Sequence, residues 1–184
     1  DMSTPGIEVR PIKQMTGDSE FCEVFFSDVA IPSDAVLGDV NGGWAVAMAV
    51  LQDERGGAGA SGVISLRRRL EKMIQGVGQV NSLQIDGLIR ILNRGKALQS
   101  LMERRGGDAQ IAPIAKLMNS ELGYDEAQID SSLHGAQSML TSPSTEALLY
   151  SPGMRIAGGT SEIQRNIIGE RLLGLPREPQ IASD

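Results

Sequence analysis

The sequence predicts a mainly α fold, an antiparallel four-helix bundle preceded by a few β-strands. Hydrophobic residues make up 41% of the 184 residues and aromatic residues only 3%. A core must then be built from aliphatic side chains, which suit helices. Apolar residues recur at intervals of three and four from residue 42 onward, whereas the residues before 38 show β-type alternation. We therefore place a β segment at residues 1–38 and a helical domain at residues 39–184.

The β segment contains two runs typical of strands. Residues 7–10 alternate between apolar and charged side chains, and we expect Pro11 to end that strand. Residues 21–29 form a second run, rich in β-branched and aromatic residues. Two strands are too few to fold alone, so this segment needs neighbouring strands or helices. The one cysteine, Cys22, cannot form an internal disulfide, and we expect it to be a buried structural thiol.

The helical domain divides at its glycines and prolines. The first helical pattern begins at Gly42 and continues weakly to Met73. Further helices are predicted from Ser82 to Arg105, from about Gln110 to Leu133, at Glu146–Tyr150 as a short helix, and from Ser161. The region around Pro143 and Pro152 is expected to be mainly loop. Long helices with short connections favour an antiparallel up-and-down bundle.

Charge and composition argue against several functional classes. The net charge of −6 and the pI near 4.9 argue against nucleic acid and against an anionic membrane surface as partners. The single histidine, His134, argues against a Ser-His-Asp or Cys-His site, and no group of residues has metal-ligand spacing. We recognise neither a signal peptide nor an apolar run long enough to span a bilayer. We expect a cytoplasmic protein without a bound metal.

A pair of glycines precedes the last predicted helix. Gly158 and Gly159 come before Ser161, and Ser161 followed three residues later by Gln164 fits a capping box. Glycines at a helix start let a ligand approach the main chain and meet its free N–H groups. Spacing alone favours an ordinary structural helix start over a binding turn, so at this level both interpretations stay open.

Glu54 interrupts a helical stripe of otherwise small or apolar side chains. On a helix it shares one face with Ala47, Leu51 and Ala58. A carboxylate there would be partly desolvated, which raises its pKa toward the range useful for a general base. The alternative is that residues 53–55 form a solvated charged patch, and periodicity alone favours that alternative.

Three stretches of the sequence carry more specific motifs. They are Glu23-Val24-Phe25-Phe26 with Leu37-Gly38, then Gly42-Gly43-Trp44 leading to Glu54-Arg55-Gly56, and last Gly159-Thr160-Ser161-Glu162-Ile163-Gln164-Arg165 with Gly169-Glu170-Arg171. Together they resemble the C-terminal half of the flavin-dependent acyl-CoA dehydrogenases, in the family's order and at about its spacing. The resemblance implies that residues 1–38 are the C-terminal remnant of the middle β domain and that residues 39–184 are the C-terminal helical-bundle domain.

The resemblance also implies a catalytic base. Acyl-CoA dehydrogenases use one glutamate to remove the α-proton of an acyl-CoA thioester, while the β-hydrogen leaves as hydride to FAD. In most members that glutamate directly precedes the Gly-Thr-Ser turn, where this chain has Gly158. A minority place it on the helix that opens the C-terminal domain, directly before an arginine. Those positions correspond to Glu54 and Arg55, so we expect Glu54 to be the base and Arg55 to bind the substrate.

The same resemblance assigns the residues around the glycine pair to substrate and cofactor. The N–H groups of Gly158 and Gly159 would bind the thioester oxygen, and Thr160, Glu162 and Gly135 match positions near FAD. Relatives often carry glutamine at the position of Glu162. Of a Gln-x-Leu-Gly-Gly segment at the FAD pyrophosphate, only Gly135 is kept convincingly. An Arg-x-x-Phe-Gly motif that reaches the FAD of a neighbouring subunit has no clean match in this chain.

Partners follow from the resemblance as well. We expect an acyl-CoA substrate, FAD, an electron-transfer flavoprotein and a homo- or hetero-oligomer, with this chain inactive when alone. The alternative is a non-catalytic subunit that completes a partner's site, consistent with Gly158 and the altered flavin motifs. A third possibility, from a different class, is a helical interaction module unrelated to flavin.

Overall fold

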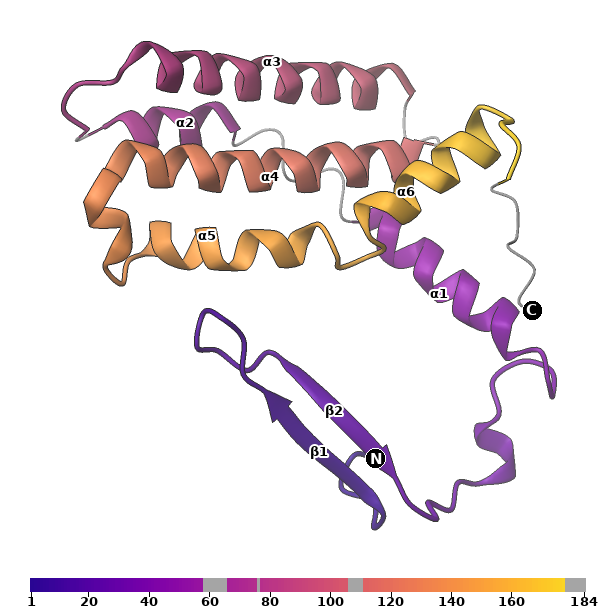
Figure 1. Cartoon of the computed structure of the whole chain (residues 1–184). Coiled ribbons are helices and arrows are strands. Elements are labelled where there is room, and N and C mark those ends of the chain that lie inside the picture. Colours follow the sequence, from indigo (N-terminus) through magenta and orange to yellow (C-terminus); the bar gives the residue numbers. More distant parts are fainter. Residues whose placement is uncertain (58–65, 76, 106–110, 178–184) are drawn as a thin grey trace, which may run out of the picture. The chain divides into compact units, whose positions relative to one another are not determined.

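A computed structural model of the chain describes residues 1–57, 66–75, 77–105 and 111–177. The fold is mainly helical, as predicted, with a two-stranded antiparallel sheet near the N-terminus (Figure 1). The chain divides into two compact units, Asp1–Val50 and Leu51–Asp184. This division falls inside α1 (Gly43–Gly57), and the domain boundary between residues 38 and 39 stays a prediction.

The first unit is built around a β-hairpin. β1 (Ile7–Ile12) pairs antiparallel with β2 (Phe21–Phe26), and Ile7 lies opposite Phe26. The prediction that Pro11 ends the first strand is wrong, because β1 continues through Pro11 within the paired register. Each strand of a two-stranded sheet has a free edge, so a proline without an N–H donor is tolerated there.

The hairpin leaves large apolar side chains exposed. Phe21 is 54% exposed and Phe26 is 68% exposed, because two strands provide no second layer to cover them. Cys22 is exposed as well, so the expectation of a buried thiol is wrong for this chain. A short 3-10 turn (Ser33–Ala35) follows the hairpin and precedes α1.

The second unit is a set of packed helices. They are α2 (Leu66–Ile74), α3 (Ser82–Arg105), α4 (Ala112–His134), α5 (Pro143–Met154) and α6 (Ser161–Ile167), the last continued by a π-helical turn (Ile168–Leu172). α4 packs against α2, α3, α5 and α6. Figure 1 shows α3, α4 and α5 running side by side. α4 is therefore the central element of the unit.

The start of α3 has a clear local cause. Asn81 N donates to Gln84 Oε1 at 3.0 Å, and Gln84 N donates to Asn81 Oδ1 at 2.9 Å, which together form a capping box. The bounds of α3 agree with the helix predicted over residues 82–105. The stretch predicted as one helix from Gly42 to Met73 contains α1 and α2, and residues 58–65 between them lie outside the described residues.

α5 is longer than the sequence predicts. It covers 12 residues where only a short helix within a loop was expected. Pro143 occupies its first turn, where a missing N–H costs nothing. Ser142 caps the helix by accepting a hydrogen bond from Thr145 N at 3.2 Å. Pro152 lies near the C-terminal end of α5, so the two prolines sit near the ends of a helix instead of breaking one.

The core of the second unit lies where α2, α3 and α4 meet. Its buried aliphatic residues are Leu66, Leu70, Leu88, Ile91, Leu98, Ala115, Leu122 and Leu133. Gly95 lets α2 approach α3 closely, since a Cβ on Gly95 would lie 1.9 Å from Leu66 Cδ2. A bidentate ion pair adds to this packing, because two nitrogens of Arg69 on α2 each lie 2.8 Å from a carboxylate oxygen of Glu126 on α4.

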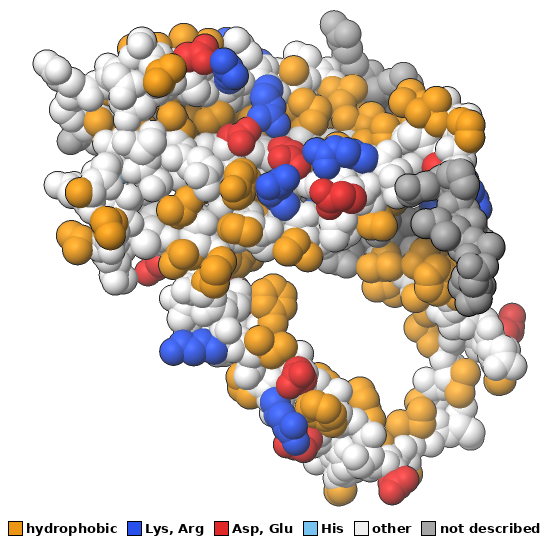
Figure 2. Space-filling view, in the orientation of Figure 1, with side chains coloured by type: hydrophobic (Ala, Val, Ile, Leu, Met, Phe, Trp, Pro, Cys, Tyr) orange, Lys and Arg blue, Asp and Glu red, His pale blue; other side chains and the backbone are white. Residues whose placement is uncertain are grey.

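The surface of the helical unit carries both signs of charge. Figure 2 shows acidic and basic side chains interspersed on its visible face. Arg90 pairs with Asp86 at 2.8 Å, and Arg94 on α3 pairs with Asp125 on α4. None of the described helices has both the length and the apolarity that crossing a bilayer requires. Within the same residues, no three His, Cys, Asp or Glu side chains gather closely enough to hold a metal ion.

Candidate functional site

The glycine turn, residues 158–160, joins the end of α5 to α6. Thr160 is the N-cap of α6, and its Oγ1 accepts a hydrogen bond from Ile163 N at 3.2 Å. The predicted capping box between Ser161 and Gln164 is therefore wrong, because Ser161 is already the first residue of the helix. Ser161 and Gln164 are buried instead, with 1% and 0% of their surface exposed. The side chain of Ser161 donates to Glu121, and that of Gln164 donates to Gly158 O.

The backbone of the glycine turn favours glycine at two positions. The φ angle is 65° at Gly158 and 96° at Gly159, a region that residues with a Cβ rarely adopt. There is nevertheless space beside the first of them, since the one atom of the described residues that a Cβ on Gly158 would meet is Lys116 Cε, at 3.8 Å. Backbone conformation, and not crowding, is what selects glycine at Gly158.

Side chains hold both glycine carbonyl groups. Lys116 Nζ, from α4, donates to Gly159 O at 2.6 Å. Gln164 Nε2, from α6, donates to Gly158 O at 3.0 Å. In contrast, no group among the described residues accepts a hydrogen bond from the N–H of Gly158, Gly159 or Thr160. The two glycine carbonyls are thus held in place by side chains, and the three consecutive backbone N–H groups of the turn are available to donate to a ligand.

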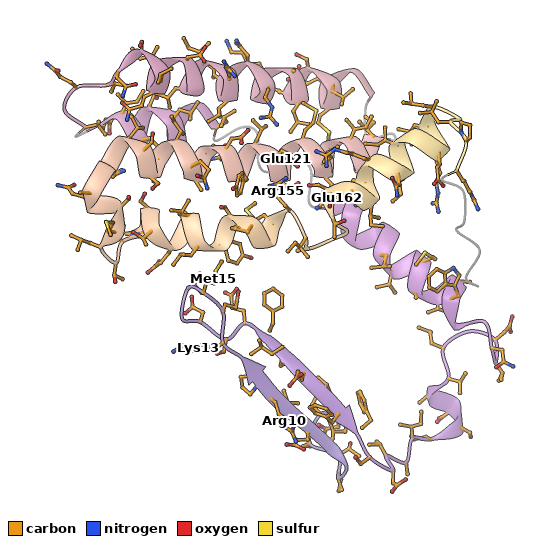
Figure 3. The ribbon with its side chains drawn as sticks, in the orientation of Figure 1. Arg10, Lys13, Met15, Glu121, Arg155 and Glu162 are labelled. Carbon is orange, nitrogen blue, oxygen red and sulfur yellow. The ribbon has the colours of Figure 1, made fainter. Side chains whose placement is uncertain are left out.

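Glu121 on α4 anchors the start of α6. Its Oε1 accepts a hydrogen bond from Ser161 Oγ at 2.9 Å. The same oxygen lies 3.3 Å from Nη2 of Arg155 and 3.3 Å from Nη2 of Arg165. Figure 3 shows Glu121, Arg155 and Glu162 gathered where α4 and α6 meet. The Arg155 guanidinium also lies over the ring of Tyr124, 4.8 Å from its centre.

These neighbours set the charge state of Glu121. Burial raises the pKa of its carboxyl, but the hydrogen bond from Ser161 and the charges of Arg155 and Arg165 outweigh burial, so the pKa lies below its usual value. Glu121 is therefore a carboxylate at neutral pH. It acts as a fixed hydrogen-bond acceptor and not as a proton carrier.

Glu162 lies directly after the glycine turn. Its side chain is 74% exposed, and Arg165 Nη1 lies 3.7 Å from one carboxylate oxygen. Hydrogen bonds from its own N–H and from the Thr160 hydroxyl, together with the charges of Arg165 and Arg155, lower the pKa of this carboxyl. Thr160 and Glu162 thus lie beside the free donors of the turn, where the family resemblance implies cofactor contacts.

Gly135 lies at the other end of α4. Its φ is 55°, and its N–H donates to Ser131 O at the end of that helix. Gly135 is 19 residues from Lys116 (135 − 116), so at the rise of an α-helix about 28 Å separates it from the glycine turn. A Cβ on Gly135 would meet no atom of the described residues within 4 Å, so this part of the described surface is open. A single copy of the chain does not bring Gly135 to the turn.

Glu54 and Arg55 lie near the C-terminal end of α1. Their side chains fall outside the described residues. The roles of Glu54 as base and Arg55 as substrate-binding residue therefore stay predictions.

The described residues fit a cofactor rich in hydrogen-bond acceptors, as FAD is. Carbonyl oxygens, phosphate oxygens and unprotonated ring nitrogens are acceptors that a free N–H group of the glycine turn, such as that of Thr160, can satisfy. The open surface at Gly135 allows a second, separate close approach to the main chain. Two places in the chain can therefore receive such a group, one at each end of α4.

Sequence reasoning missed the residues that hold the turn from α4. Lys116 is 43 residues from Gly159, and Glu121 is 40 residues from Ser161, so no local pattern connects them. One signal exists for Glu121, which falls four residues after Leu117 on an otherwise apolar helical face. A carboxylate on such a face needs a partner.

Comparison with known proteins finds relatives over most of the chain. Residues 90–173 match the family model described as acyl-CoA dehydrogenase, C-terminal domain. The chain is 34% identical over 194 residues to acyl-CoA dehydrogenase IpdE1 of Mycolicibacterium smegmatis, covering 96% of this chain and 48% of that protein. It is 33% identical over 187 residues to acyl-CoA dehydrogenase FadE34 of Mycobacterium tuberculosis, covering 96% of this chain and 26% of that protein. The chain thus spans half or less of the length of these relatives.

Solved structures share the fold. A glutaryl-coenzyme A dehydrogenase in complex with glutaryl-CoA superposes with a TM-score of 0.79 at 19% identity, over 95% of this chain and 49% of that one. The ChsE4–ChsE5 complex from Mycobacterium tuberculosis gives a TM-score of 0.76 at 22% identity, over 96% of this chain and 52% of the matched chain. At these identities the likeness shows the fold alone.

Proposed function

We propose that this chain, which belongs to the acyl-CoA dehydrogenase family, forms the C-terminal helical part of an FAD-dependent enzyme. The reaction is the removal of hydrogen from the α and β carbons of an acyl-CoA thioester. The proposal rests on one observation above all. Both carbonyls of the glycine turn are held by Lys116 and Gln164, while the N–H groups of Gly158 and Gly159 have no acceptor among the described residues.

Two free N–H groups suit the hardest step of this chemistry. The α-proton of a thioester is weakly acidic, so its removal requires that charge developing on the thioester oxygen be stabilised. Donors fixed in place before the reaction do this without reorganisation, and one such donor contributes about 10²- to 10³-fold in rate. In this proposal Gly158 and Gly159 bind the thioester oxygen through their N–H groups.

The proposed base is Glu54, with Arg55 beside it to orient the acyl-CoA. Gly158 carries no carboxylate at the turn itself, and its positive φ disfavours one. A base must then come from another element, and Glu54 is the candidate that the sequence offers on α1. FAD, when bound, accepts the hydride that leaves the β carbon. Thr160 and Glu162 of one copy would contact it, and Gly135 would contact it from another copy or subunit.

The proposed partners extend beyond this chain. Because Gly135 and the glycine turn lie at opposite ends of α4, a single FAD near both would have to lie between copies or subunits, which favours a homo- or hetero-oligomer. We propose an electron-transfer flavoprotein as the acceptor that reoxidises the flavin. The expected location is the cytoplasm.

A second function has a specific observation in its favour. The turn position that carries the base in most of the family is occupied by Gly158. A subunit without a base of its own can still complete a partner's site, with the same N–H groups and the same fold. In that case Glu54 would be a solvated surface residue.

Anaerobic titration with a panel of acyl-CoAs separates the two functions. The experiment uses the intact flavoprotein with any partner subunits, as wild type, as Glu54→Gln, and as Asp53→Asn for a matched control one residue away. We expect acyl-CoA to bleach the flavin absorbance of the wild type and of Asp53→Asn. Glu54→Gln should bleach more slowly by several orders of magnitude with its flavin still bound, because the amide cannot accept the α-proton.

Other outcomes count against parts of the proposal. A Glu54→Gln protein that bleaches at the wild-type rate places the base elsewhere and favours a non-catalytic subunit whose partner supplies it. A wild-type protein that binds no flavin, or that no thioester bleaches, removes the dehydrogenase function itself.

A further inference from the structure

The Lys116 side chain crosses from α4 to the glycine turn. Its Nζ lies 2.6 Å from Gly159 O, and its Cε lies 3.8 Å from the place that a Cβ on Gly158 would take. The stem of the lysine therefore lies on the side of the turn where a side chain would project from residue 158. We propose that Lys116 is a positioning residue for the dehydrogenation: it fixes the conformation of the turn, and with it the direction of the Gly158 and Gly159 N–H groups, and it strengthens the N–H of Thr160 as a donor. This inference rests on the function proposed above.

A tether is needed because glycine has no strong backbone preference. Two successive glycines populate positive and negative φ about equally, so the conformation at Gly158 and Gly159 has to be imposed by their surroundings. Of the two side chains that hold the glycine carbonyls, Gln164 belongs to α6 and moves with it. Lys116 comes from another helix, so its hydrogen bond sets the position of the turn relative to α4.

The ammonium group also acts through the peptide bond that it contacts. The carbonyl of Gly159 and the N–H of Thr160 belong to the same peptide unit. A hydrogen bond accepted by that carbonyl polarises the unit and makes the N–H a stronger donor. A bond from a charged donor is roughly twice as strong as a neutral one. Lys116 therefore increases the donor strength of Thr160 N–H, as Gln164 does for Gly159 N–H with a neutral amide.

Ordinary structural anchoring of this region is provided separately. Glu121 binds Arg155, which precedes the turn, and Ser161 and Arg165, which follow it. Loss of the lysine contact should therefore leave α6 docked on α4. It should change mainly the geometry and donor strength at residues 158–160, which matters for the reaction step more than for substrate binding.

Lys116→Met tests the inference, with Lys116→Arg as the conservative variant. Lys72→Met is the matched control, because Lys72 is exposed in the last turn of α2 and loses the same charge. The intact flavoprotein is reduced by acyl-CoA under anaerobic conditions over a range of concentrations. We expect Lys116→Met to lower the limiting rate of flavin reduction about 10- to 100-fold, with less than about threefold change in the half-saturating concentration. Lys116→Arg should recover part of the rate, and Lys72→Met should match the wild type.

A second readout does not depend on turnover. Hydrogen exchange, followed by mass spectrometry, should be faster in Lys116→Met at Ser161, Ile163 and Gln164, whose N–H groups donate to Arg155 O or to Thr160, and unchanged in α5. The inference is wrong if Lys116→Met matches Lys72→Met in both rate and exchange, or if its rate falls only in proportion to lost flavin or lost folded protein. A wild type that no acyl-CoA reduces overturns the proposed function and the catalytic role of Lys116 with it. Faster exchange in that protein would leave Lys116 as a structural tether only.

Discussion

Replacing Glu121 by glutamine removes a negative charge from the junction of α4 and α6 while keeping a side-chain oxygen in place. The Glu121 carboxylate accepts a hydrogen bond from Ser161 at 2.9 Å, and glutamine can still accept it. The ion pairs with Arg155 and Arg165, both at 3.3 Å, are lost. The substitution therefore isolates the effect of charge on the docking of α6.

The free energy lost with these two ion pairs depends on how exposed the two arginine side chains are. Arg165 is 53% exposed, and a pair of that kind contributes about 0–1 kcal/mol. Arg155 is 35% exposed, and a hydrogen bond to a charged group at such a site contributes about 1.5–3 kcal/mol before solvent screening reduces it. We expect Glu121→Gln to lower the free energy of opening of α6 by about 1–3 kcal/mol, which is about 5- to 150-fold in the opening equilibrium.

Hydrogen exchange in the intact protein measures this opening directly. Amides of residues 164–167 are hydrogen-bonded within α6 and exchange when the helix opens. Their exchange should accelerate about 5- to 150-fold in Glu121→Gln. Glu103→Gln is the matched control, because Glu103 is exposed on α3 and, among the described residues, its carboxylate has only the hydrogen bond from Gln99. Exchange that changes equally in both variants, or in neither, would refute the reasoning that Glu121 docks α6 through its charge.

Two further predictions concern packing and pH. Gly95→Ala places a Cβ 1.9 Å from Leu66, and we expect the overpacking cost of about 1–3 kcal/mol to exceed the helix-propensity gain of about 1 kcal/mol. The thermal midpoint of Gly95→Ala should fall, whereas Gly153→Ala, whose added Cβ has no atom of the described residues within 4 Å, should not lower the midpoint. The pKa of the Glu121 carboxyl is lowered in the folded state. The carboxylate therefore stabilises the docking of α6 fully above its ordinary pKa, and this stabilisation is lost as the pH falls through the lowered pKa of the folded state. The exchange difference between wild type and Glu121→Gln should stay constant between about pH 5 and pH 8 and shrink in more acidic solution, and a difference that grows there would contradict the assignment.

The bundle was predictable because its helices carry their own local signals. α3 begins after the Asn81–Gln84 capping box and shows apolar spacing along its length, so its bounds agree with the prediction. α5 was underestimated because Pro143 and Pro152 indicate breaks, although proline is compatible with a first turn. Local patterns therefore located the helices well where the ends had caps and poorly where the ends had prolines.

The site was only partly predictable. The Gly158–Gly159 pair is visible in the sequence, but both Thr160 and Ser161 are good N-cap residues. Which of the two caps the helix depends on a tertiary contact. Ser161 turns to Glu121 on α4, which leaves Thr160 to cap the helix. Lys116 was not predictable for the same reason, since its partner is 43 residues away in the chain.

The vibrational frequency of a bound thioester tests the central claim most directly. An unreactive acyl-CoA analogue labelled with ¹³C at its thioester carbonyl is bound to the intact flavoprotein, and the isotope-edited infrared difference spectrum gives the carbonyl stretch. If the N–H groups of Gly158 and Gly159 hold the thioester oxygen, donors fixed in a dry site should move the stretch to lower frequency than in water. A stretch at the frequency found in water, or above it, would contradict the account.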